Sequence, residues 1–196
     1  MNYLAHAYLS FNEPGILIGN MISDFVKGKT KFNYPEGVQK GIAIHRAIDD
    51  FTDQHAATRR AKEFFRPAYR LYSGAFIDIV YDHFLANDSN EFPGDRLESF
   101  SQEVYKTLEE NIAILPQRFG QMFPYMKTQN WLLNYKQRWG IEKSFGGMVR
   151  RAKYLDESAI AFGLFNQHYD ELQRCYDVFF PDLKSYTRNL VSLTLL

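Results

Sequence analysis

Residues 41–53 read Gly-Ile-Ala-Ile-His-Arg-Ala-Ile-Asp-Asp-Phe-Thr-Asp, and the fold prediction starts from this stretch. Apolar residues recur in and just before it at helical spacing, which predicts a helix with one face towards a core; they are Val38, Ile42, Ile48 and Phe51. His45, Asp49 and Asp53 follow one another at intervals of four, so they form a row at the edge of that face. Burying such groups without partners is costly, so the row needs a metal ion, a substrate phosphate or a hydrogen-bond network.

Length and composition describe a single globular domain. The chain has 196 residues, of which 45% are hydrophobic and 16% aromatic. Its 23 basic and 23 acidic residues balance, so nothing in the charge suggests nucleic acid or an anionic membrane as a partner. A lone cysteine, Cys175, excludes an intramolecular disulfide and a multi-cysteine zinc site. Without a signal-peptide pattern or a long apolar run, the expected location is the cytoplasm, away from membranes.

Helical periodicity dominates the whole chain, with no hairpin or βαβ signal. We therefore predict an all-α fold, a single compact domain over residues 1–196. Prolines and glycines suggest where helices end. The expected helices include 16–26, 35–54, 55–65 (ending before Pro67), 75–86, 97–115, 156–180 and 182–196.

Polar pairs recur on other helices of the N-terminal half. His6 follows Asn2 by four residues, Asp24 follows Asn20 by four, and Asp82-His83 follows Asp78, each within an apolar sequence. Four such helices predict convergence on one site between packed helices, where helical bundles build metal centres. Imidazoles and carboxylates suit Mn, Fe, Zn or Mg, and the absence of thiolates argues against a structural zinc.

A structural polar network is the alternative explanation for the same residues. Taken singly, His6 is more often a hydrogen-bonded core residue than a ligand, and Asn20 could be an interhelical hydrogen-bonding residue. Asp24, His45, Asp49 and the pair Asp82-His83 are harder to explain in this way, because buried charges need strong compensation. Asp53 is the weakest member of the set.

Four ordered stretches carry a resemblance to a known family; they are residues 1–6, 19–28, 41–53 and 78–85. With weaker similarity over the rest of the chain, the sequence resembles the bacterial acyl carrier protein phosphodiesterases. The resemblance implies an all-helical fold related to the HD-domain metal-dependent phosphohydrolases. It also implies a Mn-dependent hydrolysis that removes 4′-phosphopantetheine from holo-acyl carrier protein. The adjacent dyad here runs Asp82-His83 rather than His-Asp, which departs from the usual HD pattern.

From the residues and the resemblance together we assign expected roles. The expected metal ligands are Asp24, His45, Asp82 and His83, with His6 as a further ligand. Asp49 is expected to act as general base or to support a ligand, while Asn20 and Arg46 are expected to orient the phosphate. The expected cofactor is a divalent metal, Mn first, with Fe or Mg as alternatives. The number of metal ions and the oligomeric state stay open.

Basic residues follow the helix that carries His45 and Asp49; they are Arg59, Arg60, Lys62, Arg66 and Arg70. Because acyl carrier proteins are acidic, this segment is a candidate docking surface, although an ordinary solvated face would have the same composition. Two other functions remain open at this point. One is an HD-like phosphohydrolase acting on a nucleotide or another small phosphoester. The other is a non-enzymatic helical module that binds an acyl carrier protein.

Overall fold

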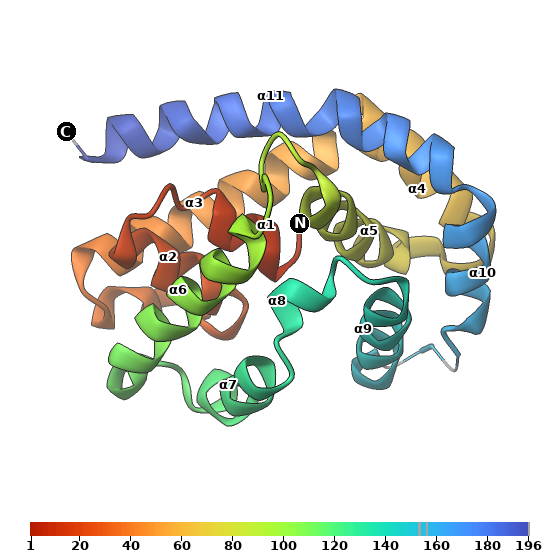
Figure 1. Cartoon of the computed structure of the whole chain (residues 1–196). Coiled ribbons are helices and arrows are strands. Elements are labelled where there is room, and N and C mark those ends of the chain that lie inside the picture. Colours follow the sequence, from red (N-terminus) through yellow and green to blue (C-terminus); the bar gives the residue numbers. More distant parts are fainter. Residues whose placement is uncertain (153, 156, 196) are drawn as a thin grey trace.

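The computed structural model describes residues 1–152, 154, 155 and 157–195, and they form helices with no strand among them (Figure 1). The predicted all-α, single-domain fold is confirmed. The α-helices are α1 (Tyr3–Tyr8), α2 (Pro14–Ile22), α3 (Glu36–Gln54), α4 (Ala56–Tyr69), α5 (Ser73–Asn87), α6 (Arg96–Glu110), α7 (Gln117–Thr128), α8 (Trp131–Asn134), α9 (Arg138–Arg151), α10 (Ala159–Gln167) and α11 (Tyr169–Leu195). Short 3-10 turns lie between them: η1 (Ser23–Phe25), η2 (Gly28–Asn33), η3 (Arg70–Tyr72) and η4 (Ile112–Ile114).

Helices α2 and α3 pack unusually close, because glycines line both sides of their contact. A Cβ atom on Gly19 would lie 2.3 Å from the carbonyl oxygen of Val38, and one on Gly41 would lie 2.4 Å from that of Ile16. Neither position can hold a side chain without moving the backbone of the other helix. The glycines therefore set the distance between α2 and α3, the helices that carry Asn20 and His45.

Helix α5 runs through the centre of the molecule and contacts α1, α4, α9 and α11 (Figure 1). Aromatic rings fill the space around it, and the fully buried ones include Phe65, Phe76, Tyr81, Phe84, Phe145, Phe165, Tyr176 and Phe179. The high aromatic content of the sequence is thus largely core. Helix α11 lies along the top of the molecule in Figure 1, over α3 and α4.

Several predicted helix ends are wrong: α2 ends at Ile22 instead of 26, α6 ends at Glu110 instead of 115, and two more were predicted at prolines. Helix α4 continues through Pro67 to Tyr69, and α11 runs unbroken through Pro181, while the C-terminal break falls at His168 instead. Both prolines lie on the exposed sides of their helices, where the carbonyl that loses its partner can bond to water. Buried side chains just before and after each proline hold the helix on the core. The predicted ends at Asp156 and Leu196 lie outside the described residues.

Within the described part of the chain, no helix combines the length and hydropathy needed to cross a membrane.

Candidate metal centre

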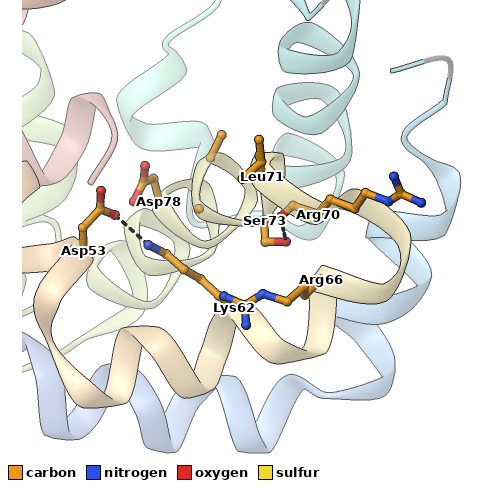
Figure 2. Close-up of a pocket in the computed structure, with 9 residues that line it drawn as sticks. Asp53, Lys62, Arg66, Arg70, Leu71, Ser73 and Asp78 are labelled. Carbon is orange, nitrogen blue, oxygen red and sulfur yellow. Dashed lines mark hydrogen bonds and ion pairs between the residues drawn. The ribbon is translucent and has the colours of Figure 1, made fainter. Parts of the chain in front are cut away.

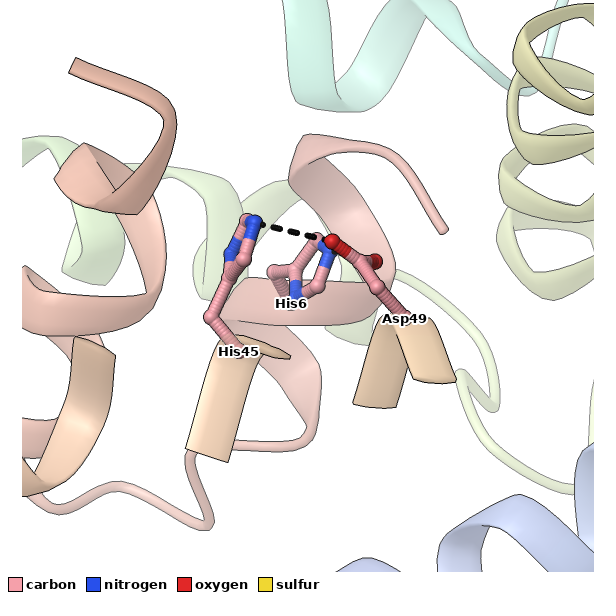
Figure 3. Close-up of side chains that lie close together, drawn as sticks. All are labelled: His6, His45 and Asp49. Atoms are coloured by element: carbon pink, nitrogen blue, oxygen red, sulfur yellow. Dashed lines mark ion pairs between the residues drawn. The ribbon is translucent and has the colours of Figure 1, made fainter. Parts of the chain in front are cut away.

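His6, His45 and Asp49 come together between α1 and α3, as Figure 3 shows. One ligand atom from each of the three lies within 4.8 Å of the other two. The imidazole rings are stacked, with centroids 3.8 Å apart and an angle of 14° between their planes. Both histidines are buried, whereas the Asp49 side chain is 42% exposed. The group is therefore open to solvent on the carboxylate side only.

A chain of hydrogen bonds fixes His45. Its Nδ1 lies 2.8 Å from the carbonyl oxygen of Asn20, and because a carbonyl only accepts, Nδ1 carries the proton. The neutral ring then has its lone pair on Nε2, which faces the group. The buried amide of Asn20 donates to Ser10 Oγ at 2.8 Å, and Ser10 Oγ donates to the carbonyl oxygen of His6 at 2.9 Å. Together these bonds hold α1, α2 and α3 in one register, as the outer partners of metal-binding histidines do.

Two carboxylates surround Nε2 of His45. Asp49 Oδ2 lies 3.2 Å away and Asp24 Oδ1 3.4 Å away, while the other oxygen of Asp49 lies 3.3 Å from His6 Nε2. Asp24 belongs to η1, and its side chain is 73% exposed. Asp24 is therefore not the buried carboxylate that the sequence predicted, although it does lie beside the group.

The pKa values of the group follow from these contacts. Burial and the neighbouring His45 lower the pKa of His6 to about 4. For His45, burial also favours the neutral ring, but hydrogen bonds to Asp24 and Asp49 outweigh it and raise the pKa to about 9. The hydrogen bond from His45 lowers the pKa of Asp24; for Asp49, bonds from His45 and His6 overcome burial and lower the pKa. At neutral pH two carboxylates thus share one imidazolium proton.

The residues present fit a divalent cation. The neighbourhood also has unused polar atoms, since the buried Nδ1 of His6 and Oδ1 of Asn20 have no hydrogen-bond partner. Two imidazoles and a carboxylate are a ligand set that suits Mn, Fe or Zn.

Asp82 lies outside this group. Its side chain is fully buried, and its two oxygens accept backbone N–H groups of Asn2, Leu4 and Ala5 at 3.3, 2.8 and 3.2 Å. The carboxylate thus caps the first turn of α1, the helix that carries His6. Burial outweighs these bonds and raises the pKa of Asp82 to about 7.

His83 is also used elsewhere. Its Nδ1 lies 2.7 Å from the carbonyl oxygen of Tyr135 and its Nε2 3.0 Å from the Tyr169 hydroxyl. With both ring nitrogens engaged on the side of α5 that faces α8 and α11, His83 does not meet His6 or His45. The sequence placed His83 in the ligand set because it follows Asp82, but adjacent helical residues point about 100° apart.

Arg46, expected to orient the phosphate, is exposed and donates from Nη2 to the carbonyl oxygen of Val26 at 3.3 Å. Asp53 lies away from the group and pairs with Lys62 Nζ at 2.6 Å.

Asp78 is a residue near the site to which the sequence assigned no role. Its Oδ1 lies 2.9 Å from the amino nitrogen of Met1, and Asp49 Oδ1 lies 3.6 Å from the same nitrogen. Burial disfavours the charged amine, but Asp78 and Asp49 outweigh it and raise its pKa to about 10. In the sequence, its spacing of four from Asp82 was the signal that could have pointed to Asp78.

Of the basic residues that follow α3, three line a pocket and two lie on the open surface. Lys62, Arg66 and Arg70 line a pocket of about 670 Å³ together with Asp53, which pairs with Lys62, and Asp78 (Figure 2). We call it the basic pocket. Arg59 and Arg60 are exposed on α4 and do not line it. Because Asp78 also contacts Met1 beside Asp49, the basic pocket lies next to the His6–His45–Asp49 group.

Comparison with known proteins agrees with the resemblance in the sequence. A family model described as acyl carrier protein phosphodiesterase matches residues 1–183. Proteins named acyl carrier protein phosphodiesterase are similar over nearly the whole length. The one from Photorhabdus laumondii is 30% identical over 96% of both chains, and the one from Escherichia coli O6:H1 is 32% identical over 92% of this chain and 94% of its own. No solved structure matches, so the expected HD relationship stays a prediction. The chain belongs to the acyl carrier protein phosphodiesterase family.

Proposed function

We propose that this chain is a metal-dependent phosphodiesterase acting on holo-acyl carrier protein. It would hydrolyse the phosphodiester between 4′-phosphopantetheine and the carrier-protein serine, giving apo-acyl carrier protein and 4′-phosphopantetheine. Membership of the family supports the substrate class. The observation that carries the chemistry is the buried histidine pair, His6 and His45, with Asp49 between their ring nitrogens.

His6, His45 and Asp49 are the proposed metal ligands, with Asp24 as a further ligand at the exposed side. We assign manganese to this set from the resemblance to the family, while the two imidazoles with carboxylates would also suit Fe. A divalent cation there supplies Lewis-acid polarisation of the phosphoryl group and acidifies a water molecule. Asp82 and His83 are left out of the set because their polar atoms are engaged elsewhere.

The protein's own side chains then accept a proton, orient the His45 ring and contact the phosphate. Asp49 stays ionised at neutral pH, so whichever oxygen is not bound to the metal can accept a proton from the attacking water. Asn20 acts through its carbonyl oxygen, which fixes the His45 ring, rather than by touching phosphate. Arg46 keeps its proposed contact to phosphate, which requires it to leave the Val26 carbonyl.

Two variants, His45→Gln and Asp49→Asn, test the metal centre. Both should lose bound manganese, measured by elemental mass spectrometry, and should lower turnover about 100-fold or more. Turnover is followed by mass spectrometry of the carrier protein, where loss of the pantetheine arm identifies the reaction. His55→Gln is the matched control, because His55 is a histidine at the end of α3 that pairs with Asp182 and not with the group. Wild-type metal content and turnover in both test variants would end the metal-centre proposal.

For the macromolecular substrate we propose the basic pocket and its rim as the dock. Leu71, on the rim, is 99% exposed and lines the same pocket as Lys62, Arg66 and Arg70. An exposed apolar side chain in a pocket with basic residues suits an acidic partner that also offers an apolar contact. The pocket adjoins Asp49 through Asp78 and Met1, so a carrier protein bound there would hold its modified serine near the metal ligands.

Charge reversal tests the dock. The double variant Arg66→Glu/Arg70→Glu should raise KM for holo-carrier protein about tenfold or more and weaken its salt dependence, with kcat little changed. Arg118→Glu is the control, since Arg118 is an exposed arginine on α7, away from the pocket. Reversal at Arg59 and Arg60 should have a smaller effect, because these two do not line the pocket. Unchanged KM in the double variant would remove the dock.

Two alternatives are separated by the same assays. An HD-like phosphohydrolase for small substrates would hydrolyse members of a nucleotide panel with Mn present, and would be insensitive to the Arg66→Glu/Arg70→Glu change. A non-enzymatic binding module would bind carrier protein but leave its mass unchanged at any metal concentration. Loss of the pantetheine arm is therefore the decisive measurement.

A further inference from the structure

A second hollow lies between α8, α9 and the start of α1, and neither the metal centre nor the dock uses it. Its volume is about 810 Å³, within the range of about 300–1,000 Å³ typical of sites for small organic molecules. Aromatic side chains line it, including Tyr3, Trp131 and Trp139. We call this hollow the α8–α9 groove. The chain has two tryptophans, and both line the groove.

Two successive glycines keep one wall of the groove bare. Gly146 and Gly147 lie inside α9 and line the groove. A Cβ atom added at either would meet nothing closer than 3.5 Å, so packing does not require glycine there. Gly140 in the same helix differs, because a Cβ there would lie 2.0 Å from the carbonyl oxygen of Asn134. The bare helix backbone at Gly146 and Gly147 leaves room for a ligand where larger residues would fill the groove.

The groove reaches the metal centre through the first residues of the chain. Asn2 and Tyr3 line the groove, and Tyr3 lies on α1 one turn before His6. Met1, next to Asn2, has its amino nitrogen 3.6 Å from Asp49 Oδ1 and its carbonyl oxygen 3.2 Å from His6 Nε2. A ligand that passes Asn2 and Tyr3 can therefore have one end at the metal centre.

We propose that the α8–α9 groove holds the 4′-phosphopantetheine arm of the carrier protein during hydrolysis. The arm is an uncharged chain of methyl, methylene, hydroxyl and amide groups that ends in a thiol, with a phosphate at its other end. Its apolar groups suit the rings of Trp131 and Trp139, and its phosphate suits the end of the groove near Arg151 and the metal ligands. This inference rests on the proposed function, since that reaction transfers the phosphate of the arm from the serine oxygen to water and releases the arm as 4′-phosphopantetheine. It adds the place where the arm binds, between α8 and α9.

Free ligand can be titrated into the protein while tryptophan fluorescence is recorded. Because both tryptophans line the groove, the signal reports on this hollow. The probes are 4′-phosphopantetheine and pantetheine, which lacks the phosphate, each with Mn and with chelator. We expect a saturable change with both probes, tighter for the phosphorylated one. Gly147→Leu should raise Kd about tenfold or more by filling the groove. Gly120→Leu, in open space on α7, should leave Kd unchanged.

Failure of the groove proposal can be distinguished from failure of the proposed function. Turnover of a small diester, bis(4-nitrophenyl) phosphate, measures the metal chemistry without needing the groove, so Gly147→Leu should lose turnover of holo-carrier protein but keep this activity. Should Gly147→Leu fail to fold, Trp139→Ala takes its place, because Trp139 is 48% exposed and Trp131 still reports binding. No fluorescence change with wild type up to about 1 mM pantetheine or phosphopantetheine would overturn the inference. So would wild-type affinity in the groove variant that folds.

Discussion

Asp82 offers a sharp test, because the sequence predicted a metal ligand and the structure gives its oxygens another task. Replacing Asp82 by Asn keeps the shape but turns one acceptor into a donor. In the wild-type protein the Leu4 N–H lies 2.8 Å from Oδ2, and the N–H groups of Asn2 and Ala5 share Oδ1. In Asp82→Asn these three N–H groups have one acceptor atom fewer. Asp82→Ala removes both oxygens and leaves the N–H groups of Leu4 and Ala5 buried without partners.

The magnitude follows from these contacts. A buried polar group without a partner costs about 1–3 kcal/mol, so Asp82→Ala should lower the free energy of unfolding by about 2–6 kcal/mol and Asp82→Asn by about 1–3 kcal/mol. For a chain of this length, each kcal/mol corresponds to a fall in Tm of about 2–4 °C. Urea titration gives the free-energy difference and a thermal scan gives the Tm. Asp78→Asn is a useful comparison, because Asp78 is also on α5 but caps no helix.

Metal content, measured on the folded fraction, decides between the two roles. If Asp82 caps α1, Asp82→Asn should be less stable yet still bind manganese, with a change in Kd of less than about tenfold. A variant with wild-type stability that has lost its metal would refute the capping role and restore Asp82 as a ligand.

Three further predictions concern the helices that build the site. Gly41→Ala should destabilise the fold by about 2 kcal/mol or more in urea titrations and reduce turnover in activity assays, since the new methyl group would lie 2.4 Å from the carbonyl oxygen of Ile16. Gly120→Ala is the control: its methyl group meets open space, so stability and turnover should stay at wild-type values. Because the folded-state pKa of His45 is raised from 6.5 to about 9, the metal-free protein should be stabilised below pH 6.5 and lose up to about 3 kcal/mol as pH rises through 9. In urea titrations with chelator, His45→Gln should reduce that slope and leave the part due to the Met1 amine, whose pKa is raised to about 10. His83→Gln should keep wild-type manganese content but lower Tm, because His83 bonds to a backbone carbonyl and a tyrosine hydroxyl; loss of metal would show that His83 is a ligand after all.

Local spacing in the sequence was enough to predict much of this protein. Helical periodicity predicted the all-α fold and the helix 35–54 within a residue of its observed bounds. The interval of four between His45 and Asp49 placed both on one face, and the structure has them 3.2 Å apart. These features depend only on contacts within one helix, which the 3.6-residue repeat determines.

Contacts between helices could not be read in the same way. His6 and His45 stack where Gly19 and Gly41 allow α2 and α3 to approach closely and Asp82 anchors the start of α1. Asp82 and His45 look alike in sequence, each a polar residue in an apolar helix. What separates a capping carboxylate from a metal-site residue is which backbone or side chain lies opposite it.

Residue types and their periodicity therefore determined the helices and the likeness to the family. The tertiary structure alone decided that His6, His45 and Asp49 meet while His83 bonds to α8 and α11, and that Lys62, Arg66 and Arg70 share a pocket without Arg59 and Arg60. The physical reason is that helical spacing fixes directions around one axis. The distances between axes depend on how glycines, caps and aromatic rings pack across the whole chain.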